Sequence, residues 1–105
     1  MRVGQLWHVV QIQEPIETQD SLGGVVQTWQ RVIQPWGALE AIASREFFGS
    51  GQVQADVDHR LRLRYHDGLT PKMRVVYGAR TFAIKAVRDL DGRRRELELL
   101  LRENV

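Results

Sequence analysis

The sequence predicts a mainly β fold, a small six- to seven-stranded β-barrel or sandwich with a long central loop or short helix. Apolar and polar residues alternate with a period of two along several short runs. Turn signals separate those runs, two of them at the spacing of tight hairpins. The length of 105 residues suits one domain, 1–105, with a single modest core.

The strands follow from the alternation. The clearest run is Asp56 to Tyr65, where charged residues occupy the even positions, as in a strand with one solvent-exposed face. Gln5 to Gln13, Thr81 to Val87 and Glu96 to Leu101 follow the same pattern. The residues expected to face inward are Leu6, His8, Val10 and Ile12; Val57, His59, Leu61, Leu63 and Tyr65; Phe82, Ile84 and Ala86; and Leu97, Leu99 and Leu101.

Turns divide these runs at Gly23-Gly24, Asp67-Gly68, Gly78-Ala79 and Asp91-Gly92. The first of them leads into a strand-like stretch, Val25 to Ile33. The last two are at two-residue hairpin spacing, so Met73 to Arg102 is predicted to be a three-stranded meander. Pro35 cannot donate to a sheet ladder, and it therefore indicates an edge or a corner.

The segment from Ala43 to Gln54 does not fit a strand. Ser44 is a plausible helix N-cap, but the glycines that follow would limit a helix to one or two turns. Adjacent Phe47 and Phe48 cannot both point into one core. At least one of them is expected to be exposed until a partner covers it.

Catalytic and metal-binding patterns are missing from the sequence. Cysteine is absent, and no serine lies in a nucleophile motif. Asp58 and His59 are neighbours in sequence, but a strand would place them on opposite faces, so we interpret His59 as a core-facing, hydrogen-bonded residue. We therefore predict a non-enzyme with no catalytic residues, no metal and no cofactor. No apolar run is long enough to span a membrane and no signal peptide is evident, which indicates a cytosolic protein or an assembly built there.

Two groups of arginines leave two interpretations open. Arg60, Arg62 and Arg64 form a ladder on one strand face, and a run of three more follows the Asp91-Gly92 turn. They could contact phosphate. They could instead pair across strands with Glu96 and Glu98, which we favour because aromatic side chains are not interleaved with them. The net charge of +2 does not by itself indicate a nucleic-acid binder.

The tryptophans have separate predicted roles. Trp7 lies out of phase with the inward residues of its run, so it is either a plug at the end of the barrel or an interface anchor. Trp29 and Trp36 are expected in the core.

Several short patterns occur in a characteristic order along the chain. They are Gly4-x-Leu6-x-His8-x-Val10-x-Ile12-Gln13; Thr18-x-Asp20, Gly23-Gly24 and Trp29; Ser44-Arg45-Glu46-Phe47; His59-x-Leu61-x-Leu63-Arg64-Tyr65; Leu69-Thr70-Pro71-x-Met73-Arg74-Val75; Phe82-x-Ile84; and Arg94-x-Glu96-Leu97-x-Leu99. Their order and spacing resemble, end to end, the small head–tail joining proteins of long-tailed bacteriophages, also called head-closure or head–tail adaptor proteins.

This resemblance implies a small β-barrel with a loop inserted at about 44–55. It also implies a ring, typically a dodecamer, that lies below the portal and adaptor, closes the DNA-filled head and docks the tail. The implied partners are further copies of the chain, the portal or adaptor protein above, the tail or tail-terminator protein below, and packaged double-stranded DNA, without a membrane. The implied location is the virion, assembled in the host cytoplasm, with either monomer or ring in isolation.

In relatives the inserted loop can project into the ring lumen and act as a stopper. Here the corresponding residues, expected to serve the stopper or a subunit interface, are Ser44, Arg45, Glu46, Phe47, Phe48, Gly49, Gly51 and Gln52. DNA must slide through such a ring, so we expect Arg60, Arg62 and Arg64 to face a protein neighbour or solvent instead of the lumen. The alternatives are a monomeric β-barrel that binds nucleic acid and a tail-completion or terminator ring.

Overall fold

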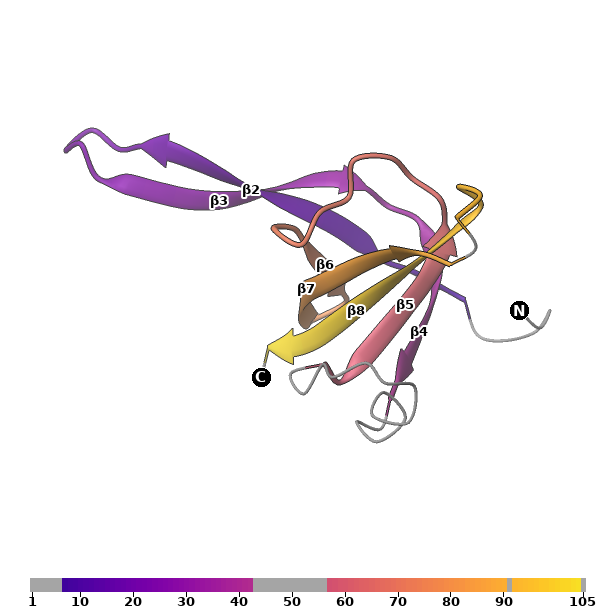
Figure 1. The fold of residues 1–105 in the computed structure, drawn as a ribbon. Helices are drawn as coiled ribbons and strands as arrows, with labels where there is room; N and C mark the ends of the chain where they lie inside the picture. The colour runs from indigo at the N-terminus through magenta and orange to yellow at the C-terminus, as the bar shows by residue number, and fades with distance from the viewer. Residues whose placement is uncertain (1–6, 43–56, 91, 105) are drawn as a thin grey trace.

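The described part of the chain is one curled antiparallel sheet without a helix (Figure 1). The computed structural model describes residues 7–42, 57–90 and 92–104. The strands are β1 (His8–Val9), β2 (Gln11–Gln19), β3 (Val25–Ile33), β4 (Trp36–Ala41), β5 (His59–Arg64), β6 (Arg74–Tyr77), β7 (Arg80–Asp89) and β8 (Glu96–Asn104). They pair in the order β1-β4-β5-β8-β7-β6-β2-β3. The predicted mainly β class is confirmed.

The sheet is a half-barrel of eight strands, and the predicted closed barrel of six or seven strands is wrong in both respects. The run expected to form one strand up to Gln13 is divided at Val10 into β1, which pairs with β4, and β2, which pairs with β6. The Val10 N–H donates to the carbonyl of Pro35 at 3.0 Å. Pro35 lies between β3 and β4, so it occupies the corner that the sequence predicted. Val10 alone connects β1, at one edge of the sheet, to β2, next to the opposite edge. The sheet therefore has to curl to bring these two edges together.

The main core fills the inner face of the curl. Its buried members are Val10, Ile12, Leu61, Leu63, Leu69, Met73, Val75, Phe82, Ile84, Leu97, Leu99 and Leu101. Most lie at the positions that the alternation predicts. Burying one such side chain contributes about 1.5–3 kcal/mol, so this cluster is the main source of stability.

Strand β8 is buried on both faces because it lies between β5 and β7 in the middle of the sheet. Leu97, Leu99 and Leu101 face the main core, as predicted. Leu100 points to the outer face and packs in a second cluster with Val57. The expectation that Val57 faces inward is therefore wrong, because Val57 precedes β5 and does not follow the alternation of that strand.

A β-bulge in β7 corrects one predicted face. Ile84 pairs with Leu101, but Ala86 pairs with Leu100, which leaves Lys85 as an extra residue. Ala86 therefore joins the outer cluster instead of the inner face on which the alternation placed it, and Val87 packs against the main core instead.

The meander β6-β7-β8 is confirmed, but only one of its turns is as short as predicted. Gly78, at φ 59°, occupies the two-residue turn between β6 and β7. The turn at Asp91-Gly92 is part of a longer connection, because β7 ends at Asp89 and β8 begins at Glu96. The Asp89 carboxylate accepts the N–H groups of Gly92 (3.1 Å) and Arg94 (3.0 Å), which holds this connection in shape.

Two identical substitutions test the position of the core. Leu99 is 0% exposed and Leu22 is 93% exposed. Leu99→Ala should lower the free energy of unfolding by about 2–5 kcal/mol, because it leaves a cavity in the core. Leu22→Ala should change it by less than about 0.5 kcal/mol. Denaturant titration of both variants measures the difference, and equal losses would contradict the described core.

Candidate functional site

The candidate functional features of the described residues are surfaces that could contact a partner. Within residues 7–42, 57–90 and 92–104, no group of three metal-ligating side chains could hold a metal ion. In the same ranges, no helix is long and apolar enough to cross a membrane. The prominent features are a projecting hairpin, a cationic pocket, an ionic outer face and an exposed apolar edge.

The hairpin of β2 and β3 projects from the body as an arm, defined here as residues 14–30 (Figure 1). β2 pairs with β6 only as far as Gln13, and from Glu14 to Gln19 its one partner among the described strands is β3. Pro15 fits here because a strand with one free side tolerates a residue that cannot donate. The molecule measures 50 × 27 × 27 Å, and the arm accounts for its long dimension.

The tip of the arm combines a rigid turn with exposed apolar side chains. The Asp20 carboxylate accepts the N–H groups of Leu22 (2.9 Å) and Gly24 (2.7 Å), and Gly23 takes φ 83°. Around this turn Leu22 is 93%, Val25 70% and Val26 42% exposed. A cluster of large apolar side chains in water is characteristic of a binding surface.

The base of the arm is anchored by Arg74 from β6. Its guanidinium lies 4.2 Å from the centre of the Trp29 ring, and its Nε donates to Gln13 at 2.8 Å. Burial lowers the pKa of Arg74, as expected for a cation partly covered by the aromatic ring. Trp29 is thus half-buried at the arm's base, and the expectation of a core position is only partly met.

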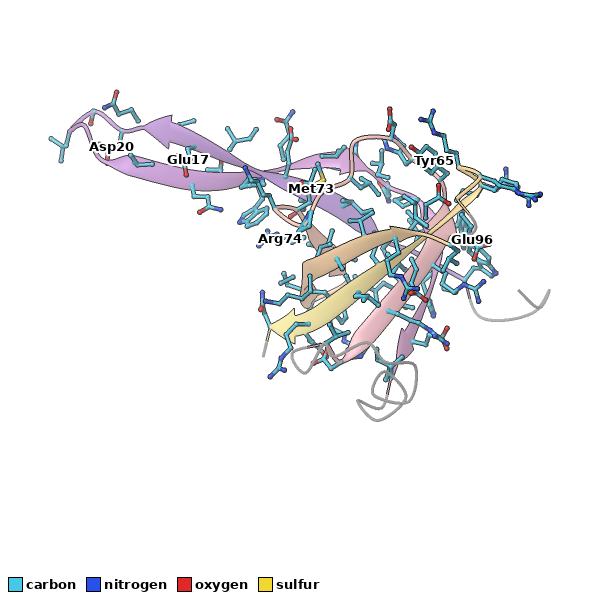
Figure 2. The ribbon with its side chains drawn as sticks, in the orientation of Figure 1. Glu17, Asp20, Tyr65, Met73, Arg74 and Glu96 are labelled. Carbon is cyan, nitrogen blue, oxygen red and sulfur yellow. The ribbon has the colours of Figure 1, made fainter. Side chains whose placement is uncertain are left out.

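A cationic pocket of about 540 Å³ lies at the other end of the molecule. It is lined by Trp7, Arg64, Tyr65, Arg94, Arg95 and Glu96 and is called the Arg64 pocket below. Figure 2 shows Tyr65 and Glu96 on the side of the body opposite Glu17 and Asp20 of the arm. The Tyr65 N–H donates to the Arg95 carbonyl at 3.1 Å, so the end of β5 and the β7–β8 connection meet here.

The aromatic wall of the pocket is held in place. The Tyr65 hydroxyl donates to Asp67 at 3.1 Å, and this hydrogen bond raises the pKa of Tyr65. Trp7 is half-buried on the same pocket. The three arginines and the two rings form a site suited to an anionic group beside an apolar one.

The arginine ladder divides into paired residues and one residue at the pocket. Arg60 contacts Glu40 at 3.0 Å and Glu98 at 3.9 Å, and Arg62 contacts Glu96 at 2.7 Å. The predicted cross-strand pairing with Glu96 and Glu98 is therefore confirmed for these two residues. Arg64, at the end of β5, is exposed and lines the Arg64 pocket.

Glu98 is a buried carboxylate on the outer face, at 6% exposure. Arg88 donates to it at 3.1 Å, and Arg60 lies on its other oxygen. A buried charge needs such partners, because removing one leaves a desolvated carboxylate unpaired. Arg60 and Arg88 therefore stabilise the folded sheet by pairing with Glu98.

A polar cluster surrounds His59 at the far end of β5. The predicted separation of Asp58 and His59 onto opposite faces is wrong, since Asp58 precedes the strand and its Oδ1 lies 2.8 Å from His59 Nδ1. The predicted core-facing, hydrogen-bonded histidine is confirmed, because the ring is half-buried, accepts or donates a hydrogen bond at Nδ1 and packs in a T-shaped arrangement with the buried Phe82 ring, 5.1 Å between centroids. Arg80 contacts the other ring nitrogen at 3.3 Å and pairs with Glu103 at 2.8 Å.

Trp36 corrects a further expectation. It was predicted in the core but is 63% exposed, because β4 turns its side chain to the outer side at the edge where β1 pairs. Opposite it in register lies Val9, 37% exposed. The two form an apolar edge, separate from the arm.

Some predicted site residues lie outside the described part of the chain. They are Ser44, Arg45, Glu46, Phe47, Phe48, Gly49, Gly51 and Gln52. Of the others, the structure brings Trp7 and Arg64 together in one pocket, while Arg60 and Arg62 belong to the ionic face. Sequence reasoning missed the arm tip. The signal was a leucine inside a turn, Ser21-Leu22-Gly23, where a polar residue is usual.

Comparisons with known proteins agree with this architecture. The family model of the phage head completion protein matches residues 1–104. The solution structure of protein SF1141 from Shigella flexneri 2a is similar, with a TM-score of 0.77 and 26% identity, over 100% of this chain and 98% of that one. A chain in the virion of the native gene transfer agent particle shares the fold, with a TM-score of 0.67 and 23% identity over 93% and 94% of the two chains. No curated protein matches the chain.

The Asp58 cluster predicts a pH dependence of stability. Burial opposes ionisation of Asp58, but hydrogen bonds from His59 and the Glu103 N–H outweigh it and lower the pKa. A carboxyl whose pKa is lower in the folded state stabilises the protein above its unfolded pKa of about 3.9, and this contribution is lost as the pH falls through the folded value. The Asp58 side chain is 39% exposed, so solvent limits the effect to about 1 kcal/mol or less.

Unfolding of the wild type and Asp58→Asn by denaturant at several pH values measures this contribution. The difference in unfolding free energy should be present at pH 6 and should shrink below about pH 4. A difference that grew on acidification would contradict the described hydrogen bonds.

Proposed function

This chain belongs to the phage head completion protein family, and we propose that it acts as a ring at the head–tail junction. Its role is that of a structural protein of phage head completion, and its location is the virion. The family prediction from the sequence is confirmed. In the proposed role, the ring lies below the portal or adaptor protein, retains the packaged DNA and offers a docking surface to the tail.

The observation that carries the proposal is the arm. A 105-residue protein that acts alone has little reason to expose the apolar side chains of Leu22 and Val25 on a two-stranded projection. The apolar edge of Val9 and Trp36 is a second surface of this kind. A subunit of a layered assembly needs more than one interface, because it contacts its neighbours in the ring and the proteins above and below it.

The paired arginines support a channel that DNA passes through. Arg60 and Arg62 are engaged by glutamates of the same sheet, so they would add little phosphate affinity. This arrangement weighs against the monomeric nucleic-acid module. The tail-completion alternative predicts that the chain attaches to tails before it attaches to heads. A binding assay with isolated tails and isolated heads therefore distinguishes tail completion from head closure.

Mass measurement by light scattering tests the junction role. The chain is measured alone and after mixing with DNA-filled, tailless heads. A ring alone, or a monomer that forms rings on heads, supports the proposal. A monomer that ignores heads and binds DNA with an affinity falling steeply with salt would support the nucleic-acid module instead.

The segment 44–55 is proposed as the stopper and subunit contact. Deletion of Phe47 to Gln52 should leave the circular dichroism spectrum unchanged, because the main core described above is formed by residues outside this segment. Particles completed with this variant should lose most of their DNA, measured as nuclease-sensitive DNA. Retention equal to that of the wild type would contradict the stopper role without affecting the ring.

A further inference from the structure

The arm tip has both apolar and acidic character. Leu22 is almost fully exposed, and Glu17 and Asp20 flank it along β2 and the turn. Over residues 11–33 the sequence holds three acidic side chains, Glu14, Glu17 and Asp20, and one basic side chain, Arg31, a balance of −2. A surface that accepts this tip needs an apolar wall beside cations.

Beyond the Arg74–Trp29 contact at its base, the arm has no backbone pairing with the other described strands of its own body. Six residues of β2, Glu14 to Gln19, pair with β3 only, which corresponds to about 20 Å of two-stranded ribbon. Such ribbons are marginally stable in water unless another surface covers them. A partner that binds the arm would therefore order it as well as bind it.

The Arg64 pocket supplies the complementary surface. Trp7 and Tyr65 offer an apolar wall, and Arg64, Arg94 and Arg95 lie around it. The one acidic side chain of its described lining, Glu96, is already paired with Arg62. The pocket is open to solvent, and its volume of about 540 Å³ falls in the range of small-ligand sites.

The arm cannot reach its own pocket, because the two lie at opposite ends of a molecule 50 Å long (Figure 2). We propose that the arm tip of one copy occupies the Arg64 pocket of the next copy. In this contact Leu22 packs on Trp7 and Tyr65, and the tip carboxylates face the pocket arginines. The contact is head-to-tail, and a contact of this type closes into a ring when its rotation permits. The inference rests on the proposed function for its ring and adds to it the surfaces that join the subunits.

Cysteine cross-linking tests the contact directly, because the natural chain has no cysteine. In the double variant Leu22→Cys/Arg64→Cys, the two thiols of one chain are too far apart to bridge, so any disulfide joins two copies. Oxidation of the full chain, in solution and on DNA-filled, tailless heads, should give a ladder of covalent oligomers. The matched control, Leu22→Cys/Lys72→Cys, keeps the arm thiol but moves the other to an exposed site outside the pocket, and it should give less than about one-tenth of the product.

Charge reversal tests the specificity of the same contact. Arg64→Glu should weaken assembly about tenfold, because it places like charges together. The double reversal Glu17→Arg/Arg64→Glu should restore most of the lost assembly. Glu17→Arg alone should weaken it by a similar factor. Failure of the double variant to recover, with both single variants folded, would overturn the proposed pairing.

The outcomes separate this inference from the proposed function. Rings on heads without cross-linking of Leu22→Cys/Arg64→Cys would overturn the arm–pocket contact and leave the junction role standing. Cross-linking in solution without attachment to heads would support the contact and count against the junction role. Protection of Arg64→Cys from maleimide by duplex DNA, and not by Leu22-bearing copies, would overturn the contact in favour of a phosphate site.

Discussion

The architecture depends on one constraint: Val10 joins two strands that belong to opposite sides of the same sheet. β1 pairs with β4 and β2 pairs with β6, so the sheet has to curl around the core to satisfy both ladders. The same constraint creates the arm. β6 is short and ends its pairing with β2 at Gln13, so the rest of the β2–β3 hairpin leaves the body unsupported on one side.

The charges of the body follow from this arrangement. Strand β8 lies in the middle of the sheet, so its outward Glu98 is buried and requires the arginines of both neighbouring strands. Arg60, in the middle of the sheet, is therefore paired with Glu98, whereas Arg64, at the end of β5, lines the Arg64 pocket. The arm and the Arg64 pocket, two of the surfaces available to partners, therefore lie at the two ends of the molecule, away from the Glu98 ion pairs. Binding at the ends leaves the ion pairs of the sheet intact, so assembly does not compete with folding.

The sequence predicts most strands and their inward residues, but it does not predict the bulge, the exposed edge residue or the pairing of distant strands. The alternation from Leu61 to Tyr65 and the leucines of β8 predict the inner face, since side-chain direction on a strand depends only on position. Val57 is misplaced because it precedes β5, where the alternation of a strand does not apply. A bulge breaks that rule, and nothing in the local pattern marks Lys85 as the extra residue, so Ala86 is misplaced. Trp36 is misplaced because hydrophobicity alone does not say which face of an edge strand meets water. The arm and the pocket depend on which strands pair, and pairing is a long-range property that periodicity does not contain.

The weakness of the arm is consistent with assembly at a defined place. A marginally stable ribbon that is stabilised on binding uses part of the contact energy for its own stabilisation, so two free copies associate weakly. Copies held side by side on a symmetric surface meet at a high effective concentration, and the same contact then becomes favourable. A stable hairpin with a fully apolar tip would instead join copies in solution, including into open filaments, since head-to-tail contacts do not close by themselves. The polar flanks Glu17 and Asp20 limit that risk, because their contribution falls with salt and depends on the opposite charges being in register.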